Sequence, residues 1–289
     1  SAPLPAGQPA FAGSFTADIG QTVSINGVSG GVDRLEVAGT GFQNLILTGT
    51  DGVQLTGNDF MVAGDFSVSI NGLAGTNYVL GNTGASATFN NVTLTRGGAA
   101  GLTGLRLQAM TNTINGSFVL NNQTVYEGRG DSLTHNFLGT VTVRAGATWR
   151  IADDDQNGAA PTVQFGQGSQ LAVALGGRTE FDIGPNAAPN PADRVLLQTV
   201  GGTGSWIFTN SNPDANGNTI IGNRVRVQGS NASSGEPINA VGSIDLGGNQ
   251  NWLLDAASED VRFVVRLVRA DGLEVAGGLS AGARVRLYG

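Results

Sequence analysis

Val23-Ser24-Ile25-Asn26-Gly27 and Val68-Ser69-Ile70-Asn71-Gly72 are two copies of one pentapeptide, set 45 residues apart (25 to 70). Ile114-Asn115-Gly116 repeats its last three residues 44 positions further on (70 to 114). Related segments containing Leu47 and Leu94 lie between the copies. Aligning all five gives a unit of 20 to 24 residues, in which a short apolar strand ends near a glycine. A repeat of this length is typical of solenoid proteins.

Short β-type runs recur about every ten residues, and most are followed by Gly, Asn-Gly or Asp-Gly. Val, Ile, Thr and Phe favour strands, whereas these glycine pairs favour tight turns. No stretch of a dozen residues combines helical apolar spacing with freedom from Gly, Asn and Pro. The sequence therefore predicts an all-β chain. The predicted strands are Thr22–Ile25, Arg34–Val37, Asn44–Leu47, Phe66–Ile70, Ala87–Leu94, Leu105–Gln108, Ser117–Leu120, Thr140–Arg144, Thr148–Ile151, Thr162–Phe165, Gln170–Leu175, Thr179–Ile183 and Val195–Thr199.

Two all-β architectures give short strands at this spacing, the β-sandwich and the parallel β-helix. Only the β-helix adds self-similarity at this period, so we expect a parallel β-helix (solenoid) with a C-terminal antiparallel β cap, and keep the β-sandwich as the alternative. We expect three parts: an N-terminal arm or cap at 1–20, a β-solenoid at 21–201, and a C-terminal β subdomain or cap at 202–289.

The C-terminal part contains two runs, 261–268 and 283–287, in which arginines alternate with apolar residues. This alternation is typical of antiparallel strands that have one apolar face and one solvent-exposed face. Residues 1–100 carry two Arg against six Asp and Glu, so the arginine faces predict a head-to-tail electrostatic contact between copies. The residues expected in this self-association are Arg262, Arg266, Arg284 and Arg286.

Composition excludes several classes of protein. A formal charge of −7 argues against nucleic acid as a partner, because phosphate binding needs a basic face. The chain has no Cys, and all 15 basic residues are Arg, so thiolate and lysine chemistry are both excluded. No apolar run approaches the length of a membrane helix, so we expect no membrane insertion. The start, Ser1-Ala2-Pro3-Leu4-Pro5, resembles a mature terminus, and we expect an extracellular or cell-surface protein.

Three segments resemble the passenger domains of bacterial autotransporters and related β-helical adhesins. They are Gly139-Thr140-Val141-Thr142-Val143-Arg144-Ala145-Gly146-Ala147-Thr148, Gly168-Ser169-Gln170-Leu171-Ala172-Val173-Ala174-Leu175-Gly176-Gly177 and Asp193-Arg194-Val195-Leu196. The likeness extends over about residues 20–205. It implies an exported β-helical surface protein and no catalytic residues.

Two segments have the spacing of the first half of an EF-hand calcium loop, in which alternate oxygens face the ion and Gly makes the turn. Both lack the glutamate that closes such a loop, since Gln164 and Asn223 stand there, and hairpin turns give the same residue types. Because the spacing matches, we keep Ca²⁺ as a candidate ligand. Its candidate ligand residues are Asp153, Asp155 and Asn157 in the first segment, and Asn212, Asp214 and Asn216 in the second.

Arg129-Gly130-Asp131 matches the tripeptide that integrins bind, so it is a candidate binding site. His135 is the only histidine, and we expect it to be an ordinary surface or turn residue. Acid–base catalysis needs titratable groups that converge in a cleft, and no such pattern stands out. We therefore expect a protein that is not an enzyme.

The expected function is that of an exported structural or adhesive surface protein, which self-assembles into a filament, surface layer or adhesin through β-strand edge pairing. Its main partner would be a second copy of itself, with cell-surface glycans as a further candidate. The alternative is a phage tail-fibre-like or carbohydrate-binding module. A polysaccharide-acting enzyme is the remaining alternative.

Overall fold

The computed structural model describes most of the chain between residues 22 and 254, and these described residues contain strands and one 3-10 turn (Val200–Gly202) but no α-helix. Contacts divide the chain into two compact units, 1–257 and 258–289, and the second lies outside the described residues. The described ranges are 22–27, 33–36, 41–49, 53–56, 60–70, 78–80, 86–96, 104–107, 110–121, 125–129, 133–152, 160–181, 194–212, 219–221, 225–240 and 242–254.

The strands form three stacks, and every described pairing is parallel. The first stack contains β3 (Gly41–Phe42), the first halves of β6 (Phe60–Ile70) and β8 (Ser86–Arg96), β10 (Thr111–Ile114), β13 (Thr134–Phe137), β16 (Thr162–Phe165), β19 (Leu196–Thr199), β22 (Arg226–Val227) and β25 (Ile244–Asp245). The second contains β1 (Thr22–Gly27), β4 (Asn44–Gly49), the second halves of β6 and β8, β11 (Phe118–Leu120), β14 (Val141–Val143), β17 (Gln170–Val173), β20 (Trp206–Asn210) and β23 (Ser230–Asn231).

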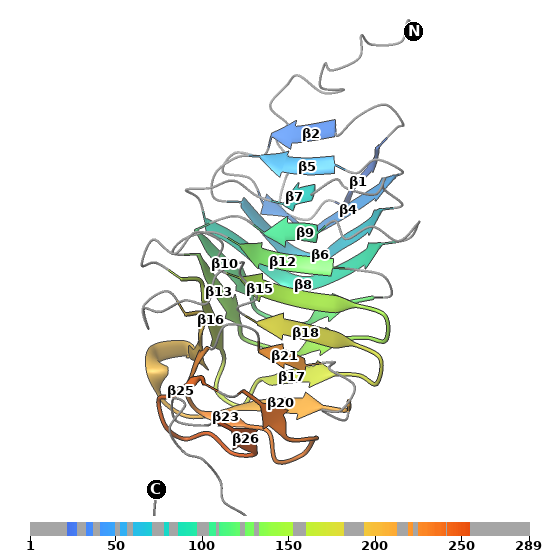
Figure 1. The fold of residues 1–289 in the computed structure, drawn as a ribbon. Helices are drawn as coiled ribbons and strands as arrows, with labels where there is room; N and C mark the ends of the chain where they lie inside the picture. Colours follow the sequence, from blue (N-terminus) through green and yellow to red (C-terminus); the bar gives the residue numbers. More distant parts are fainter. Residues whose placement is uncertain are drawn as a thin grey trace, which may run out of the picture. The chain divides into compact units, whose positions relative to one another are not determined.

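The third stack is a separate eight-stranded sheet, followed by a two-stranded sheet of β24 (Ile238–Asn239) and β26 (Trp252–Leu253). Because β6 and β8 run through the first two stacks, those stacks form one 16-stranded sheet. Figure 1 shows the strands lying one above another from β2 to β26. The third stack contains β2 (Asp33–Glu36), β5 (Val53–Thr56), β7 (Tyr78–Leu80), β9 (Gly104–Leu107), β12 (Val125–Arg129), β15 (Thr148–Ala152), β18 (Arg178–Phe181) and β21 (Thr219–Ile221).

The chain visits the three stacks in turn and then begins a new layer, which we call a rung. Strands β13, β14 and β15 form one rung, and β16, β17 and β18 pair with them in the same order. This order confirms the predicted all-β class with strands stacked in parallel. Each predicted strand overlaps an observed strand, and β16 has the predicted bounds, whereas the prediction missed β3, β5, β7, β10, β12 and β13.

The period of the predicted repeat is close to the observed one, but its register is wrong in places. Ile25 pairs with Leu47 as aligned, whereas Leu47 pairs with Val68 instead of Ile70. A shift of two residues keeps the same side of the strand facing the same way, so sequence similarity alone does not detect it. The observed ladder through the second stack is Ile25, Leu47, Val68, Leu94, Leu120, Val143, Val173 and Asn210.

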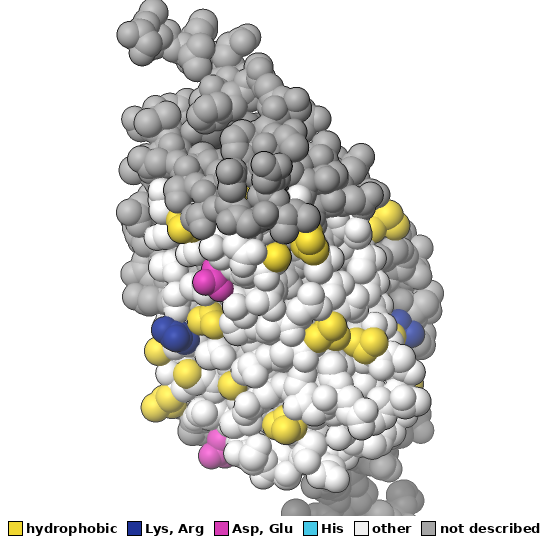
Figure 2. Space-filling model, turned by 180° about the vertical axis from the view of Figure 1, so that it is seen from behind, with side chains coloured by type: hydrophobic (Ala, Val, Ile, Leu, Met, Phe, Trp, Pro, Cys, Tyr) yellow, Lys and Arg dark blue, Asp and Glu magenta, His cyan; other side chains and the backbone are white. Residues whose placement is uncertain are grey.

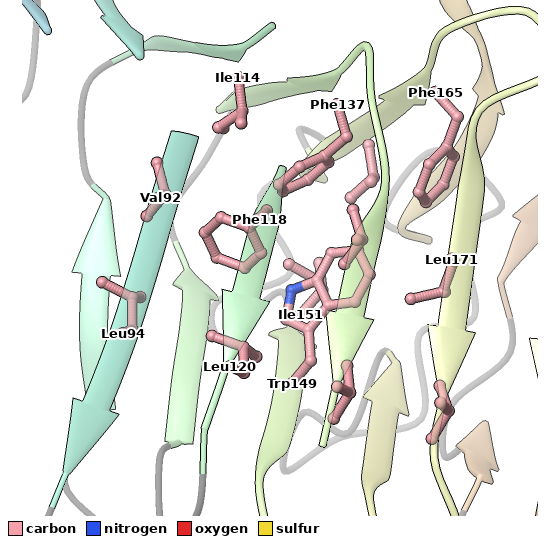
Figure 3. Close-up of a cluster of buried hydrophobic side chains, with 14 of the residues drawn as sticks. Val92, Leu94, Ile114, Phe118, Leu120, Phe137, Trp149, Ile151, Phe165 and Leu171 are labelled. Atoms are coloured by element: carbon pink, nitrogen blue, oxygen red, sulfur yellow. The ribbon is translucent and has the colours of Figure 1, made fainter. Parts of the chain in front are cut away.

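One buried cluster draws side chains from all three stacks. Strands such as β10, β13 and β16 alternate half-buried and buried residues, so every second side chain enters the cluster. The ring of Phe137 lies 5.1 Å from Phe118 in the second stack and 5.3 Å from Trp149 in the third. Figure 3 shows these rings with the aliphatic side chains around them. The cluster therefore stabilises all three stacks together, through burial of apolar area.

Glycines permit close contact between rungs at the bend from the first stack to the second. A Cβ on Gly139 would clash with the backbone of Gly116 in the rung before it. At the same bend, Asn91 Oδ1 accepts hydrogen bonds from the Ser117 backbone N–H (3.0 Å) and hydroxyl (3.1 Å). Small residues and asparagines thus let successive rungs turn at the same place.

The parallel ladders continue past residue 201, where the sequence predicts the start of a C-terminal subdomain. β20 pairs with β17 and with β23, and β22 pairs with β19 and with β25, always in parallel. The described strands between residues 202 and 254 are therefore parallel, not antiparallel. The predicted antiparallel runs at 261–268 and 283–287 lie outside the described residues.

Candidate functional site

Asn212 is the one predicted calcium ligand within the described residues, and its buried side-chain amide binds a turn of the preceding rung. Its Oδ1 accepts the Gly176 N–H (2.7 Å), and its Nδ2 donates to the carbonyls of Ala174 (2.9 Å) and Gly177 (3.2 Å). Asn210 holds Asn212 in turn, because its Oδ1 accepts the Asn212 N–H at 3.1 Å. Asn212 would have to change these contacts to bind an ion, so the observed role of its side chain is to hold the turn.

The other five calcium candidates, Asp153, Asp155, Asn157, Asp214 and Asn216, lie outside the described residues, so both calcium segments stay predictions. Within the described ranges, no three His, Cys, Asp or Glu side chains come together as a metal-binding group. The first segment falls between β15 and β16, and the second between β20 and β21. Both therefore belong to connections between strands.

Arg129 ends β12 and pairs in register with Ala152, while Gly130 and Asp131 lie outside the described residues. The four arginines expected in self-association, Arg262, Arg266, Arg284 and Arg286, also lie outside them. The integrin-type tripeptide and the arginine faces therefore stay predictions.

His135 is fully buried, so the expectation of a surface or turn residue is wrong. It occupies an inward position of β13, between Asn112 of β10 and Val163 of β16. Its Nδ1 lies 3.5 Å from the Asn112 amide nitrogen, and its ring stacks on Phe137. Burial lowers the pKa of His135 from 6.5 to about 4, because the interior disfavours the charged ring. His135 is therefore a neutral core residue at pH 7.

One cluster of charged side chains lies on the third stack. The Glu180 carboxylate pairs with Arg150, whose Nη2 is 2.6 Å and Nε 2.7 Å from Oε2, and with Arg178 through Oε1. Glu180 is nearly buried, and Arg150 is its register partner on the next strand. Each charge therefore has an opposite charge beside it, which is the arrangement of a structural ion pair.

Outward side chains of the first two stacks are mainly uncharged and connect neighbouring rungs. Asn136 Nδ2 donates to Thr113 Oγ1 (3.3 Å), Asn121 to Thr95 (2.9 Å), and Gln170 Nε2 to Thr209 Oγ1 (3.0 Å). Figure 2 shows few charged side chains among the described residues of the face opposite to Figure 1. The described exterior in this view is mainly uncharged, with scattered hydrophobic side chains.

The two ends of the described strand ladders differ. At the N-terminal end, β1 is six residues long and has β4 as its partner strand among the described residues, while β2 has β5. At the C-terminal end, β25 and β26 are two residues long. Edge strands carry backbone N–H and C=O groups that can bind another strand. The edge pairing predicted from the sequence does not distinguish these two edges.

A scan against protein-family models finds no match, and searches of curated proteins and of solved structures find none either. The resemblance to autotransporter passengers therefore stays a prediction. Among the described residues, no helix is long and apolar enough to cross a membrane.

Proposed function

We propose that this chain folds as a parallel β-solenoid and is an exported structural or adhesive surface protein, which self-assembles through strand edges. The main support is the parallel ladder that runs through the second stack from Ile25 to Asn210. Rungs that pair along their strands and share one core resist bending, so the body is stiff. Such a body suits a mechanical role more than a catalytic one.

The mechanism of assembly is β-augmentation, in which a strand of one copy pairs with the edge of another. A stack of parallel strands has two different ends. When one end of a copy binds the opposite end of the next copy, the contact is head-to-tail, and its repetition generates a polymer. The proposed setting is extracellular or on the cell surface, the proposed partner is the chain itself, and no catalytic step is assigned.

Negative-stain electron microscopy of the native protein tests this proposal. We expect filaments or a lattice, and a population of monomers at all concentrations would contradict it.

A further inference from the structure

The two edges of the described ladders are unequally suited to accept another strand. A partner strand needs a run of extended backbone with free N–H and C=O groups along it. β1 offers six consecutive extended residues, Thr22–Gly27, and pairs with β4 without a register shift. In a parallel ladder alternate backbone groups point to either side, so the side of β1 away from β4 carries a row of donors and acceptors.

The C-terminal rung, residues 244–254, is a poor acceptor. Its extended backbone is interrupted at Gly247 (φ 100°), Gly248 (φ 74°) and Asn251 (φ 60°), which adopt a conformation that strands exclude. Asn251 Nδ2 donates to the carbonyls of Ala232 (3.0 Å) and Gly235 (3.1 Å), and so holds that bend on the rung before it. Short and interrupted edge strands are the usual protection against edge pairing.

We propose that the edge of β1 away from β4, which has no partner strand among the described residues, is the acceptor for a strand from a second copy of this chain, and that the donor is the run 261–268. This inference rests on the proposed function and assigns the two surfaces that it needs. The described part of the C-terminal rung ends at residue 254, and residues 255–289 follow it in the sequence. The donor therefore follows in sequence the rung at the opposite end of the described ladders from the acceptor, as head-to-tail growth requires.

The sequence of the donor run matches what the edge of β1 requires. In β4 the core-facing Leu45 and Leu47 alternate with half-buried Ile46. Leu45 pairs with Val23 of β1, Ile46 with Ser24, and Leu47 with Ile25. An added strand must continue this period of two. Residues 261–267 do so, with Val, Phe, Val and Leu at the odd positions and Arg, Val and Arg at the even ones. The arginines of the donor run also match in charge the acidic residues 1–100, which contain two Arg against six Asp and Glu.

Two substitutions in the full-length chain test the donor. Phe263→Asp places a carboxylate on the predicted apolar face, whereas Val264→Asp places the same group on the arginine face and is the matched control. Because a buried unpaired charge is costly, we expect Phe263→Asp to raise the concentration needed for polymers by about tenfold or more. Val264→Asp should polymerise like the wild type, and thermal melting should show that both variants keep the solenoid.

The absence of cysteine makes a cross-linking test straightforward. Ser24→Cys lies at the middle of β1, and Arg262→Cys and Arg266→Cys lie at even positions of the donor. Mixed under oxidising conditions, Ser24→Cys with one of the arginine variants should give a disulfide-linked dimer, because paired strands bring Cβ atoms within disulfide reach. Ser24→Cys mixed with Thr142→Cys, on an outward position of β14, should not.

The outcomes separate this inference from the proposed function. If the wild type forms no polymers, the proposed function is overturned. If the wild type polymerises and Phe263→Asp polymerises equally well, only the donor assignment is overturned. If a chain carrying both Ser24→Cys and Arg266→Cys links to itself as a monomer, the segment covers its own edge, and the claim of a second copy is wrong.

Discussion

His135 is the residue whose structural position differs most from its sequence-based interpretation. A single histidine in a Gly-rich chain reads as a turn residue, yet it occupies an inward position where neighbouring rungs have Asn112 and Val163. Period-two alternation could have found it: Leu133, His135 and Phe137 are all buried, while Thr134 and Asn136 between them are half-buried. Because histidine is polar, residues 133–137 do not show the apolar alternation by which a half-buried strand is recognised in a sequence.

Burial of His135 predicts acid sensitivity. The pKa is about 4 in the folded chain and 6.5 when unfolded, so the unfolded state binds the proton first as pH falls. The contribution is fully present above pH 6.5 and is lost as pH falls from there to about 4; it amounts to about 2 kcal/mol between pH 7 and pH 5. Denaturant unfolding of wild type and His135→Val at both pH values measures this loss. An equal loss in both proteins would contradict the assignment.

Asn212 predicts a second local effect. Asn212→Ala removes the partners of three backbone groups in the turn 174–177, so we expect the free energy of unfolding to fall by about 3 kcal/mol. Asn212→Asp should also destabilise, because a carboxylate cannot donate to the Ala174 and Gly177 carbonyls. Leu175→Ala in the same turn is the control, since Leu175 is 67% exposed. Equal stability of all three variants would mean that the turn does not depend on this amide.

At the scale of elements, the bend between the first and second stacks depends on close packing of backbone. Gly139→Ala would force its Cβ against Gly116, so we expect a loss of about 2 kcal/mol or more in unfolding free energy. Gly168→Ala, in the next rung, meets no atom within 4 Å and carries only the cost of its φ of +72°. Gly168→Asn should therefore be tolerated, while Gly139→Asn should not. Thermal melting compares the four variants, and equal melting temperatures for Gly139→Asn and Gly168→Asn would contradict the close contact.

The strands that the sequence predicts were recognisable because each is short, apolar on one side and closed by turn residues, whereas β13 and five others were missed. Register was not recognisable, since pairing Leu47 with Val68 or with Ile70 places the same strand face inward. Nor was the continuity of the ladders beyond residue 201, because connections of different length separate the later strands. β18 and β19 are separated by residues 182–195, whereas β12 and β13 are separated only by 130–133.

The connection between β15 and β16 is where calcium binding would act. If Asp153, Asp155 and Asn157 bind Ca²⁺, the ion stabilises the folded state by mass action, so the melting temperature should rise with added Ca²⁺ and fall with EDTA. Asp155→Ala should abolish the difference, and Asp214→Ala tests the second segment separately. A melting temperature that responds to neither Ca²⁺ nor EDTA would contradict calcium binding by these segments.

At the scale of the whole molecule, the rungs share one core and end in two different strand edges. The inward ladders give a shared core, the outward amides and hydroxyls connect neighbouring rungs, and the C-terminal rung is interrupted while β1 is not. Because the rungs stack along one direction, a head-to-tail polymer would continue that stacking from copy to copy. We therefore predict polymers whose strands lie across their long axis.

Cryo-electron microscopy of the assembled native protein can show whether the strand stacking continues from copy to copy. We expect polymers with a layer repeat of about 4.8 Å along the long axis, the spacing of paired strands, continuing across each junction between copies. Polymers whose strands run along the axis, or particles that remain single at every concentration, would contradict it.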